Sequence, residues 1–184
     1  MLSVTSLRSG TTYEEDGNIY EVLSYEHIKM GRGSASVKVK VRNLRSGAVL
    51  EKGFISHAVV KDINLEKKEY QYLYKDSNLA YFMDPVSFEQ TVIPLKNLEG
   101  YQFLKEGESV ALRYFGIEPL GVTLPPKVTL TVTETPPGVK GNSASNVYKD
   151  ATLENGMRVR VPLFINSGDK IIVDTRDGSY TKRA

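Results

Sequence analysis

The stretch VKVKVR, residues 37–42, sets the period of the chain. Apolar and basic residues alternate strictly there, so three valines share one face of a strand and three cations share the other. The same period of two recurs in VTLTVT, residues 128–133, and in RVRV, residues 158–161. Long helical patterns are missing, and only the segment 94–104 could hold a short helix. These strands predict an all-β protein of small barrels or sandwiches.

Turn signals and shifts in composition divide the 184 residues into modules. Asp-Gly pairs at residues 16–17 and 177–178 stand between strand-like runs and predict hairpin turns. One boundary is expected near residues 62–66, and another at residues 124–127, where two prolines precede a strand. Modules of about sixty residues bury little surface, so we expect the first two to pack against each other. The predicted domains are 1–64, 65–126 and 127–184.

The composition and the N-terminus exclude several classes of protein. The chain has no cysteine, which excludes disulfides, thiol nucleophiles and thiolate metal sites. The N-terminal residues MLSVTSLRSG have neither the basic nor the apolar region of a signal peptide. No apolar run approaches the roughly 18 residues that a membrane helix requires. We therefore expect a soluble, cytoplasmic protein without a membrane partner.

Residues for catalysis do not gather in any recognised pattern. His27 and His57 lie far apart, with no cysteine or carboxylate at the spacing of a metal site. The sequence has no nucleophile elbow, phosphate-binding glycine loop or zinc-protease motif. A protein without a positioned base, nucleophile or metal is not expected to be an enzyme. We expect no cofactor and no metal.

The distribution of charge is uneven although the net charge is only +2. Residues 1–64 carry a net +2, residues 65–126 a net −3 and residues 127–184 a net +3. The segment His27–Leu50 holds six cations and no acid, which favours a polyanionic partner or, equally, a solvated strand face. The six cations are Lys29, Arg32, Lys38, Lys40, Arg42 and Arg45.

Arg32 stands between two glycines, with strand-like sequence on both sides. Gly31 and Gly33 permit a positive φ and leave the arginine unshielded. Its planar, permanently charged guanidinium group suits a phosphate or the edge of a nucleobase. Two interpretations are open: an arginine presented to a nucleic acid, or a hairpin loop that requires glycine for its geometry.

Several motifs resemble those of the bacterial elongation factor P family. The stretch KDATLENGMRVRVPLFINSG, residues 149–168, is similar to the C-terminal signature of that family, with its Lys, Ala, Gly, Val-Pro step and closing Gly. The resemblance runs from end to end, including the length. Further segments that carry it are residues 29–33, 73–74, 82–84, 133–141 and 173–184.

The resemblance implies a fold and a function. The family fold is an N-terminal KOW-like (SH3-like) barrel followed by two OB-folds, in an L-shaped arrangement similar to tRNA. Its members are translation factors that bind the 70S ribosome between the peptidyl-tRNA and exit sites, beside ribosomal RNA and the stalk protein. There they promote peptide-bond formation at consecutive prolines. On this reading the chain acts as a monomer.

The resemblance also assigns candidate site residues. Arg32 aligns with the family's functional residue at the tip of a loop that contacts the CCA end of the peptidyl-tRNA. The neighbours expected to shape this tip loop are Lys29, Met30, Gly31, Gly33 and Ser34. Gly141, Asn142 and Ser143 align with a C-terminal loop that faces RNA. To these we add an inferred RNA-backbone surface formed by Lys38, Lys40 and Arg42.

Modification of the tip is an open question in the sequence. Family members carry either a lysine with a β-lysyl-type extension or an arginine that is rhamnosylated. Arg32 excludes the lysine chemistry, and Met30 stands where both branches commonly have proline. Another departure is Asp150, where proline is common. Arg32 is therefore expected to be unmodified or to be rhamnosylated by a glycosyltransferase.

Two other functions are weighed against the main one. A paralogous factor of the same fold would act on different stall sequences, but the tail DTRDGSYTKR, residues 174–183, favours the mainstream factor. A generic OB-fold RNA-binding protein normally shows stacking aromatic residues beside basic ones. The last module offers only Tyr148, Phe164 and Tyr180 for that purpose.

Overall fold

The computed structural model describes residues 1–28, 35–138 and 148–184. In these ranges the regular structure is antiparallel β-strand together with three short 3-10 helices. The strands form three sheets, and the prediction of an all-β protein with KOW-like and OB-fold barrels is confirmed. The chain forms two compact units, of which the first comprises residues 1–99 and 106–123 and the second residues 100–105 and 124–184.

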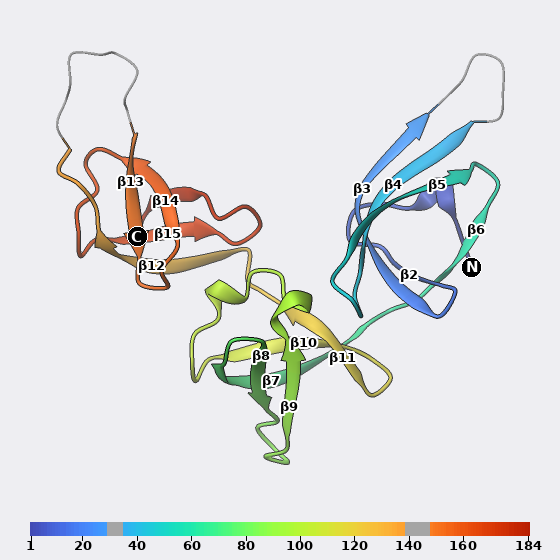
Figure 1. Ribbon diagram of the computed structural model, residues 1–184, viewed down its shortest axis with the longest axis horizontal. Helices are drawn as coiled ribbons and strands as arrows, with labels where there is room; N and C mark the ends of the chain where they lie inside the picture. The colour runs from blue at the N-terminus through green and yellow to red at the C-terminus, as the bar shows by residue number, and fades with distance from the viewer. Residues whose placement is uncertain (29–34, 139–147) are drawn as a thin grey trace. The chain divides into compact units, whose positions relative to one another are not determined.

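The first unit contains a six-stranded sheet in the order β1-β6-β2-β3-β4-β5 (Figure 1). The alternation predicted for residues 37–42 is confirmed, because Val37, Val39 and Val41 are buried while Lys38 and Lys40 are exposed. A short 3-10 helix, η1 (Val4–Ser6), follows the first strand. The strands are β1 (Leu2–Ser3), β2 (Thr12–Glu15), β3 (Asn18–Ile28), β4 (Ser36–Asn43), β5 (Val49–Ile55) and β6 (Val59–Asp62).

The two predicted Asp-Gly turns are present. Asp16 and Gly17 both have positive φ, of 50° and 72°, between the paired residues Glu15 and Asn18. Positive φ at both central residues is the mark of a type I′ hairpin, whose twist matches that of the strands it joins. The second turn has Gly178 at a φ of 73°. The short-range hairpin signal in the sequence was therefore sufficient to place both turns.

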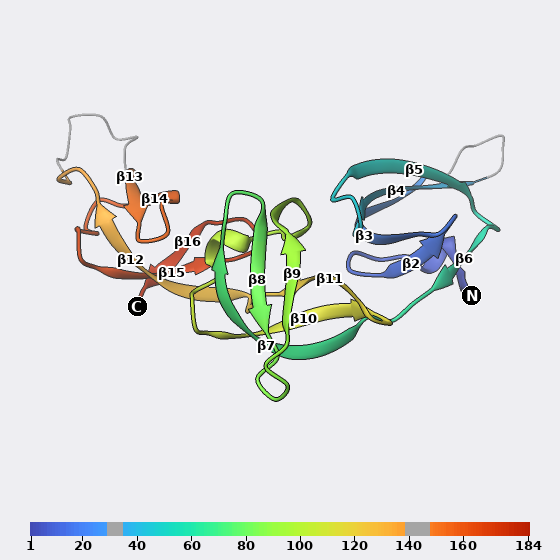
Figure 2. The same cartoon turned by 60° about the horizontal axis from the view of Figure 1, so that its bottom comes forward.

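The second sheet completes the first unit, in the order β11-β10-β7-β8-β9. Figure 2 shows β7, β8 and β9 side by side. In chain order this is 5-4-1-2-3, and β11 also lies close to β9, as expected for a five-stranded OB barrel. Two 3-10 turns, η2 (Leu95–Asn97) and η3 (Tyr101–Phe103), occupy the segment where a short helix was expected. The strands are β7 (Glu66–Lys75), β8 (Leu79–Met83), β9 (Gln90–Pro94), β10 (Ser109–Phe115) and β11 (Glu118–Thr123).

The third sheet lies in the second unit and, from its other edge, repeats the 5-4-1-2-3 order as β16-β15-β12-β13-β14. Leu130 and Val132 point inward from its first strand, as the alternation at residues 128–133 predicts. The core also receives Phe103, which belongs to this unit although it precedes β10 in the chain. The strands are β12 (Lys127–Glu134), β13 (Tyr148–Leu153), β14 (Arg158–Pro162), β15 (Lys170–Asp174) and β16 (Tyr180–Arg183).

The two sheets of the first unit share a small apolar cluster. Ile19 lies on β3, Leu44 directly follows β4 and Leu120 lies on β11, and all three are at most 1% exposed. The cluster confirms the expectation that the first two modules pack against each other. Its partly buried members are Ile63, Leu65 and Phe115.

A membrane-crossing helix is not found among the described residues.

Candidate functional site

A long hairpin carries the predicted tip loop. The strands β3 and β4 pair from Tyr20 and Asn43 up to Ile28 and Ser36, and residues 29–35 connect them. All six predicted tip residues, Lys29 to Ser34, lie outside the described residues, and so do Gly141, Asn142 and Ser143. Their assigned roles stay predictions.

The end of this hairpin is held from its other side by the chain after β5. The backbone N–H of Ser56 donates to the Ala35 carbonyl at 3.0 Å, and the Ser56 hydroxyl donates to the same oxygen at 2.5 Å. Val37, opposite Phe54 on β5, is fully buried. Because both neighbouring strands and the core fix β4, the base of the tip loop is firmly supported.

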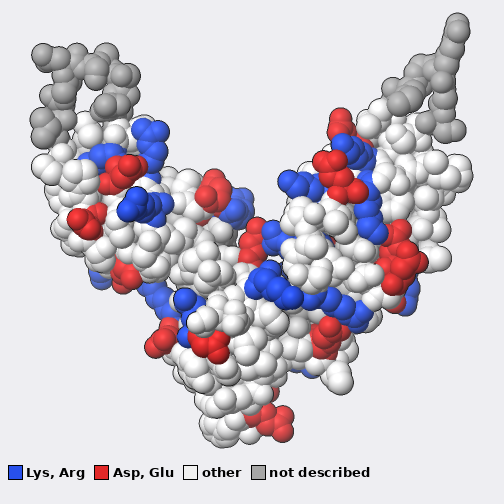
Figure 3. Space-filling model, in the orientation of Figure 1, with Lys and Arg blue, Asp and Glu red and all other residues white. Residues whose placement is uncertain are grey.

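The predicted RNA-backbone residues lie on the exposed face of β4, where two of them meet acids. Lys38 pairs with Glu51 on β5 at 2.9 Å, which raises the pKa of Lys38 and lowers that of Glu51. Arg42 pairs with Glu99 of the same unit. Within the described ranges Lys40 makes no ion pair. Figure 3 shows blue and red groups interspersed over this unit, so the basic run is partly neutralised by acids from elsewhere in the chain.

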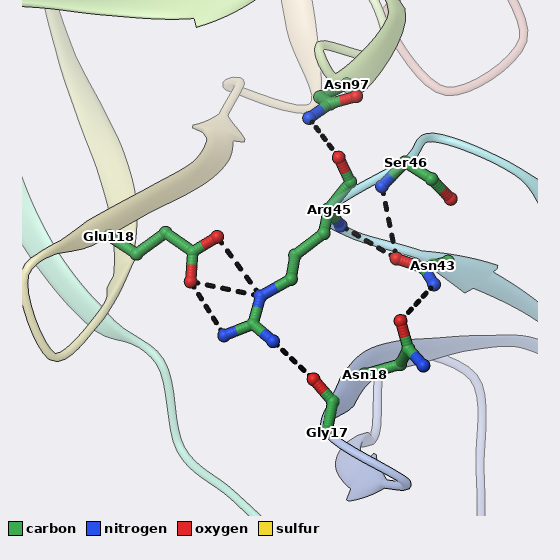
Figure 4. A network of polar contacts seen from close by, with 7 residues as sticks. All are labelled: Gly17, Asn18, Asn43, Arg45, Ser46, Asn97 and Glu118. Atoms are coloured by element: carbon green, nitrogen blue, oxygen red, sulfur yellow. Dashed lines mark hydrogen bonds and ion pairs between the residues drawn. The ribbon is translucent and has the colours of Figure 1, made fainter.

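Arg45 is the centre of a polar network that joins the two sheets of the first unit (Figure 4). Its guanidinium group binds Glu118 through Nε at 3.0 and 3.1 Å and through Nη2 at 2.8 Å, and donates to the Gly17 carbonyl. The hydrogen bonds to Glu118 raise the pKa of Arg45. The Arg45 carbonyl accepts from Asn97 Nδ2 at 2.9 Å. A single residue is thus bound to the first hairpin, to β11 of the second sheet and to η2, which follows β9.

Asn43 fixes the loop from which Arg45 extends. Its Oδ1 accepts the backbone N–H groups of Arg45 and Ser46 at 2.9 and 3.1 Å, and its Nδ2 donates to Asn18 Oδ1 at 3.0 Å. Asn43 is only 8% exposed, so these bonds satisfy a polar group that would otherwise be costly to bury.

A second ion pair links the same two sheets. Arg113 Nη1 on β10 lies 2.8 Å from Glu21 Oε1 on β3, and both side chains are about one-fifth exposed, at 21% and 19%. Sequence reasoning missed Arg113, Glu21, Glu99 and Glu118 as partners. The available signal was the charge of the modules, since a basic first module followed by an acidic second one is complementary.

Asp174 organises the loop between β15 and β16 in the second unit. Its carboxylate accepts from Arg176 Nε at 2.9 Å and from the Arg176 backbone N–H at 3.0 Å, and pairs with Nη2. These bonds, most of all those from the Arg176 side chain, hold the pKa of Asp174 far below its usual range. The carboxylate therefore stabilises the fold while it is ionised.

The linkage predicts how Asp174→Asn changes the acid response of the second unit. A lowered pKa stabilises the folded state above the unfolded-state pKa of about 3.9, and this contribution is lost as the pH falls toward the folded-state pKa. We expect the variant to be less stable than the native protein at pH 7, with the difference shrinking below about pH 4. Urea unfolding at pH 7, 4 and 2.5 measures it. A difference that is constant across this range would contradict the linkage.

Metal ligation finds no support among the described residues, where no group of three His, Asp or Glu side chains gathers. The described part of the site offers instead a supported hairpin, a strand face with one unpaired lysine and a network that fixes the hairpin to the second sheet.

Comparison with known families gives the class of this protein. Three family profiles match in succession: the elongation factor P KOW-like domain at residues 3–60, its OB domain at residues 65–122 and its C-terminal domain at residues 128–183. A KOW-like barrel followed by OB barrels, each matched by a domain of this family, defines a translation factor.

Individual relatives agree over the whole chain. Elongation factor P of Clostridium kluyveri is 47% identical over 186 aligned residues, covering 100% of both chains, and that of Clostridium botulinum is 46% identical over the same span. The chain belongs to the bacterial elongation factor P family and is a translation elongation factor. A solved structure of translation initiation factor 5A from Methanococcus jannaschii is 22% identical, with a TM-score of 0.47 over 66% of this chain and 92% of that chain.

Proposed function

We propose that this factor binds the 70S ribosome in the cytoplasm, between the peptidyl-tRNA and exit sites, and promotes peptide-bond formation at consecutive prolines. The observation that supports the proposal most is the 47% identity to a curated elongation factor P over the full length of both chains. The factor acts as a monomer on peptidyl-tRNA and ribosomal RNA, with the stalk protein near the exit site as a neighbour.

The proposed action is positional and not enzymatic. Proline reacts poorly in peptide transfer, and a mobile CCA end adds an entropic cost to reaching the reactive geometry. Holding that end in place lowers this cost without an acid, a base or a metal. The paired strands of β3 and β4 and the buried valines of β4 provide the rigid base from which such a contact would be made.

Arg32 is the proposed contact, with Lys29, Met30, Gly31, Gly33 and Ser34 shaping the loop. Lys38, Lys40 and Arg42 are the proposed RNA-backbone contacts of the same domain, and Lys40 is the member without an ion pair among the described residues. Gly141, Asn142 and Ser143 are the proposed RNA-facing residues of the C-terminal domain. A guanidinium group can bind a phosphate with two parallel hydrogen bonds, which suits the end of a tRNA.

Translation in vitro of a reporter with three consecutive prolines tests the proposal. The native protein is expected to relieve the stall, and Arg32→Ala to lose most of that relief. Lys67→Ala removes one exposed positive charge from the second sheet of the same unit and serves as the matched control. No relief by the native protein would contradict the proposed function. Equal relief by the native protein and Arg32→Ala would remove Arg32 from the mechanism.

The chemical form of Arg32 is decided separately. We propose an arginine that acts either bare or after rhamnosylation by a glycosyltransferase. The intact mass of the protein from its native host distinguishes the two forms, because one deoxyhexose adds a discrete mass. Comparing both forms in the reporter assay then shows whether the sugar contributes.

A further inference from the structure

The outward face of β13 and β14 carries two arginines that differ from the other arginines of the described ranges in having no hydrogen-bonded or ionic partner. Tyr148, Arg158 and Arg160 all point outward from these strands and are exposed. Arg158 and Arg160 make no ion pair or side-chain hydrogen bond with any described residue. The other two arginines described in the same unit are paired, Arg176 with Asp174 and Arg183 with Asp169. Two unpaired guanidinium groups on one strand are available for a ligand.

An exposed aromatic ring lies beside these cations. The guanidinium carbon of Arg160 lies 5.9 Å from the centroid of the Tyr148 ring, within the range of a cation–π contact. Tyr148 nevertheless stays 51% exposed, so much of its ring is accessible. A base-stacking ring next to an unpaired arginine is the combination by which proteins bind single-stranded nucleic acid.

The face is hollowed into a groove. It is lined by Tyr148, by residues 158–160 and by residues 178–181. The latter belong to the β15–β16 connection and the start of β16. In chain order β13 and β14 are strands 2 and 3 of the barrel, and the loop before β16 joins strands 4 and 5. Strands 2 and 3 and the loop between strands 4 and 5 form the oligonucleotide-binding surface of OB-folds.

The second sheet has the same strand order but a different surface. Tyr81 on β8, its strand 2, stacks on Tyr74 with ring centroids 4.5 Å apart and donates its hydroxyl to Asp76 Oδ2 at 2.9 Å. Its partner residue in β9 is Val92, which is apolar. Tyr81 therefore already has partners within the protein for both its ring and its hydroxyl group, whereas Tyr148 lies beside arginines that have no ionic partner. The net charges agree with this difference, because residues 65–126 carry −3 and residues 127–184, which include the arginines, carry +3.

We propose that the face of Tyr148, Arg158 and Arg160 binds a segment of single-stranded RNA, with a base stacked on Tyr148 and phosphates bound by the two arginines. The inference rests on the proposed function for RNA as the natural partner, and it adds a site that is independent of Arg32. Asp150 lies opposite Arg160 in the strand register. Its negative charge on this face opposes the binding of phosphates by the arginines.

Fluorescence anisotropy of the full chain with a labelled oligouridine of roughly ten nucleotides tests the site, a length within the span of one OB-fold. Tyr148→Ala is expected to weaken binding roughly 5- to 150-fold, the range for loss of one stacked base. Tyr148→Phe keeps the ring and is expected to bind as the native protein does. Arg160→Ala is expected to weaken binding. It is also expected to reduce, by about 0.7, the magnitude of the slope of the logarithm of the association constant against the logarithm of the salt concentration.

The control is Tyr81→Ala, which removes the tyrosine from the corresponding strand of the second sheet and is expected to leave binding unchanged. A duplex RNA with the same number of phosphates is expected to bind more weakly than the single strand. Failure of the native protein to bind at low salt, equal binding by Tyr148→Ala, or equal binding of the duplex would each overturn the site. The reporter assay is scored separately, so failure of this site and failure of the proposed function are distinguishable.

Discussion

Gly47→Ala is expected to destabilise the first unit by about 2–5 kcal/mol, the sum of a conformational and a steric cost. Gly47 has a φ of +76°, which costs an L-residue roughly 1–2 kcal/mol. A Cβ at this position would lie 2.4 Å from the Lys96 carbonyl oxygen, a distance that forces backbone to move. The displaced loop carries Arg45, so the network to Glu118 and Asn97 would be disturbed as well. Urea unfolding measures the loss.

Gly10→Ala separates the two costs. Gly10 also has a positive φ, of +87°, but nothing lies within 4 Å of the position of its Cβ. We expect it to lose only the roughly 1–2 kcal/mol of the conformational cost. Hydrogen exchange should show faster exchange near residues 43–48 and 95–97 in Gly47→Ala and not in Gly10→Ala. Equal losses in both variants would mean that the contact with Lys96 does not matter.

Phe103→Ala is the second large effect, expected at about 3–5 kcal/mol in the second unit. Phe103 is 5% exposed and packs in the core formed by β12 to β16, although it lies between η2 and β10 in the chain. Its removal leaves a cavity in that core, while the core valines of the first sheet keep their contacts. Hydrogen exchange resolved by peptide should therefore show faster exchange in β12 and β15 and unchanged exchange in β3 and β4.

Phe164→Ala is the matched control for Phe103. It makes the same chemical change in the same unit at a side chain that is 60% exposed. We expect a loss well under 1 kcal/mol, since surface substitutions usually stay within about 0.5 kcal/mol. If Phe103→Ala were as mild as this control, or if it accelerated exchange in β4, the assignment of residues 100–105 to the second unit would be wrong.

Local period and turn chemistry were enough to predict much of the fold. The alternation at residues 37–42 identified β4 and its buried valines, and the Asp-Gly pairs placed two hairpin turns, because both signals act between near neighbours in the chain. The role of Phe103 could not be predicted in this way. Phe103 packs in a core whose first strand begins more than twenty residues further along the chain. Nothing in the sequence around Phe103 indicates that it belongs to this core.

The candidate site divides along the same line. The glycines around Arg32 and the resemblance to a family drew attention to the loop, and the exposed direction of Lys38 and Lys40 followed from the alternation. Arg42 and Arg45 looked alike in the sequence as members of one basic run. The structure shows that both are bound to acids of the second module, Glu99 and Glu118, which lie 57 and 73 residues further along. Pairings over such distances depend on the folded topology and not on local pattern.

The cluster of Ile19, Leu44 and Leu120 has a consequence for folding of the chain during its synthesis on the ribosome. The last strand of the first sheet ends at Asp62, but β11, which carries Leu120, begins only at Glu118. Since the ribosome synthesises about 5–20 residues per second, several seconds or more pass between the completion of the first sheet and the synthesis of Leu120, which covers Ile19 and Leu44. During that interval the nascent first barrel exposes two of its apolar side chains. The rate of translation through residues 63–120 therefore sets how long the nascent chain can form non-native contacts through these two side chains.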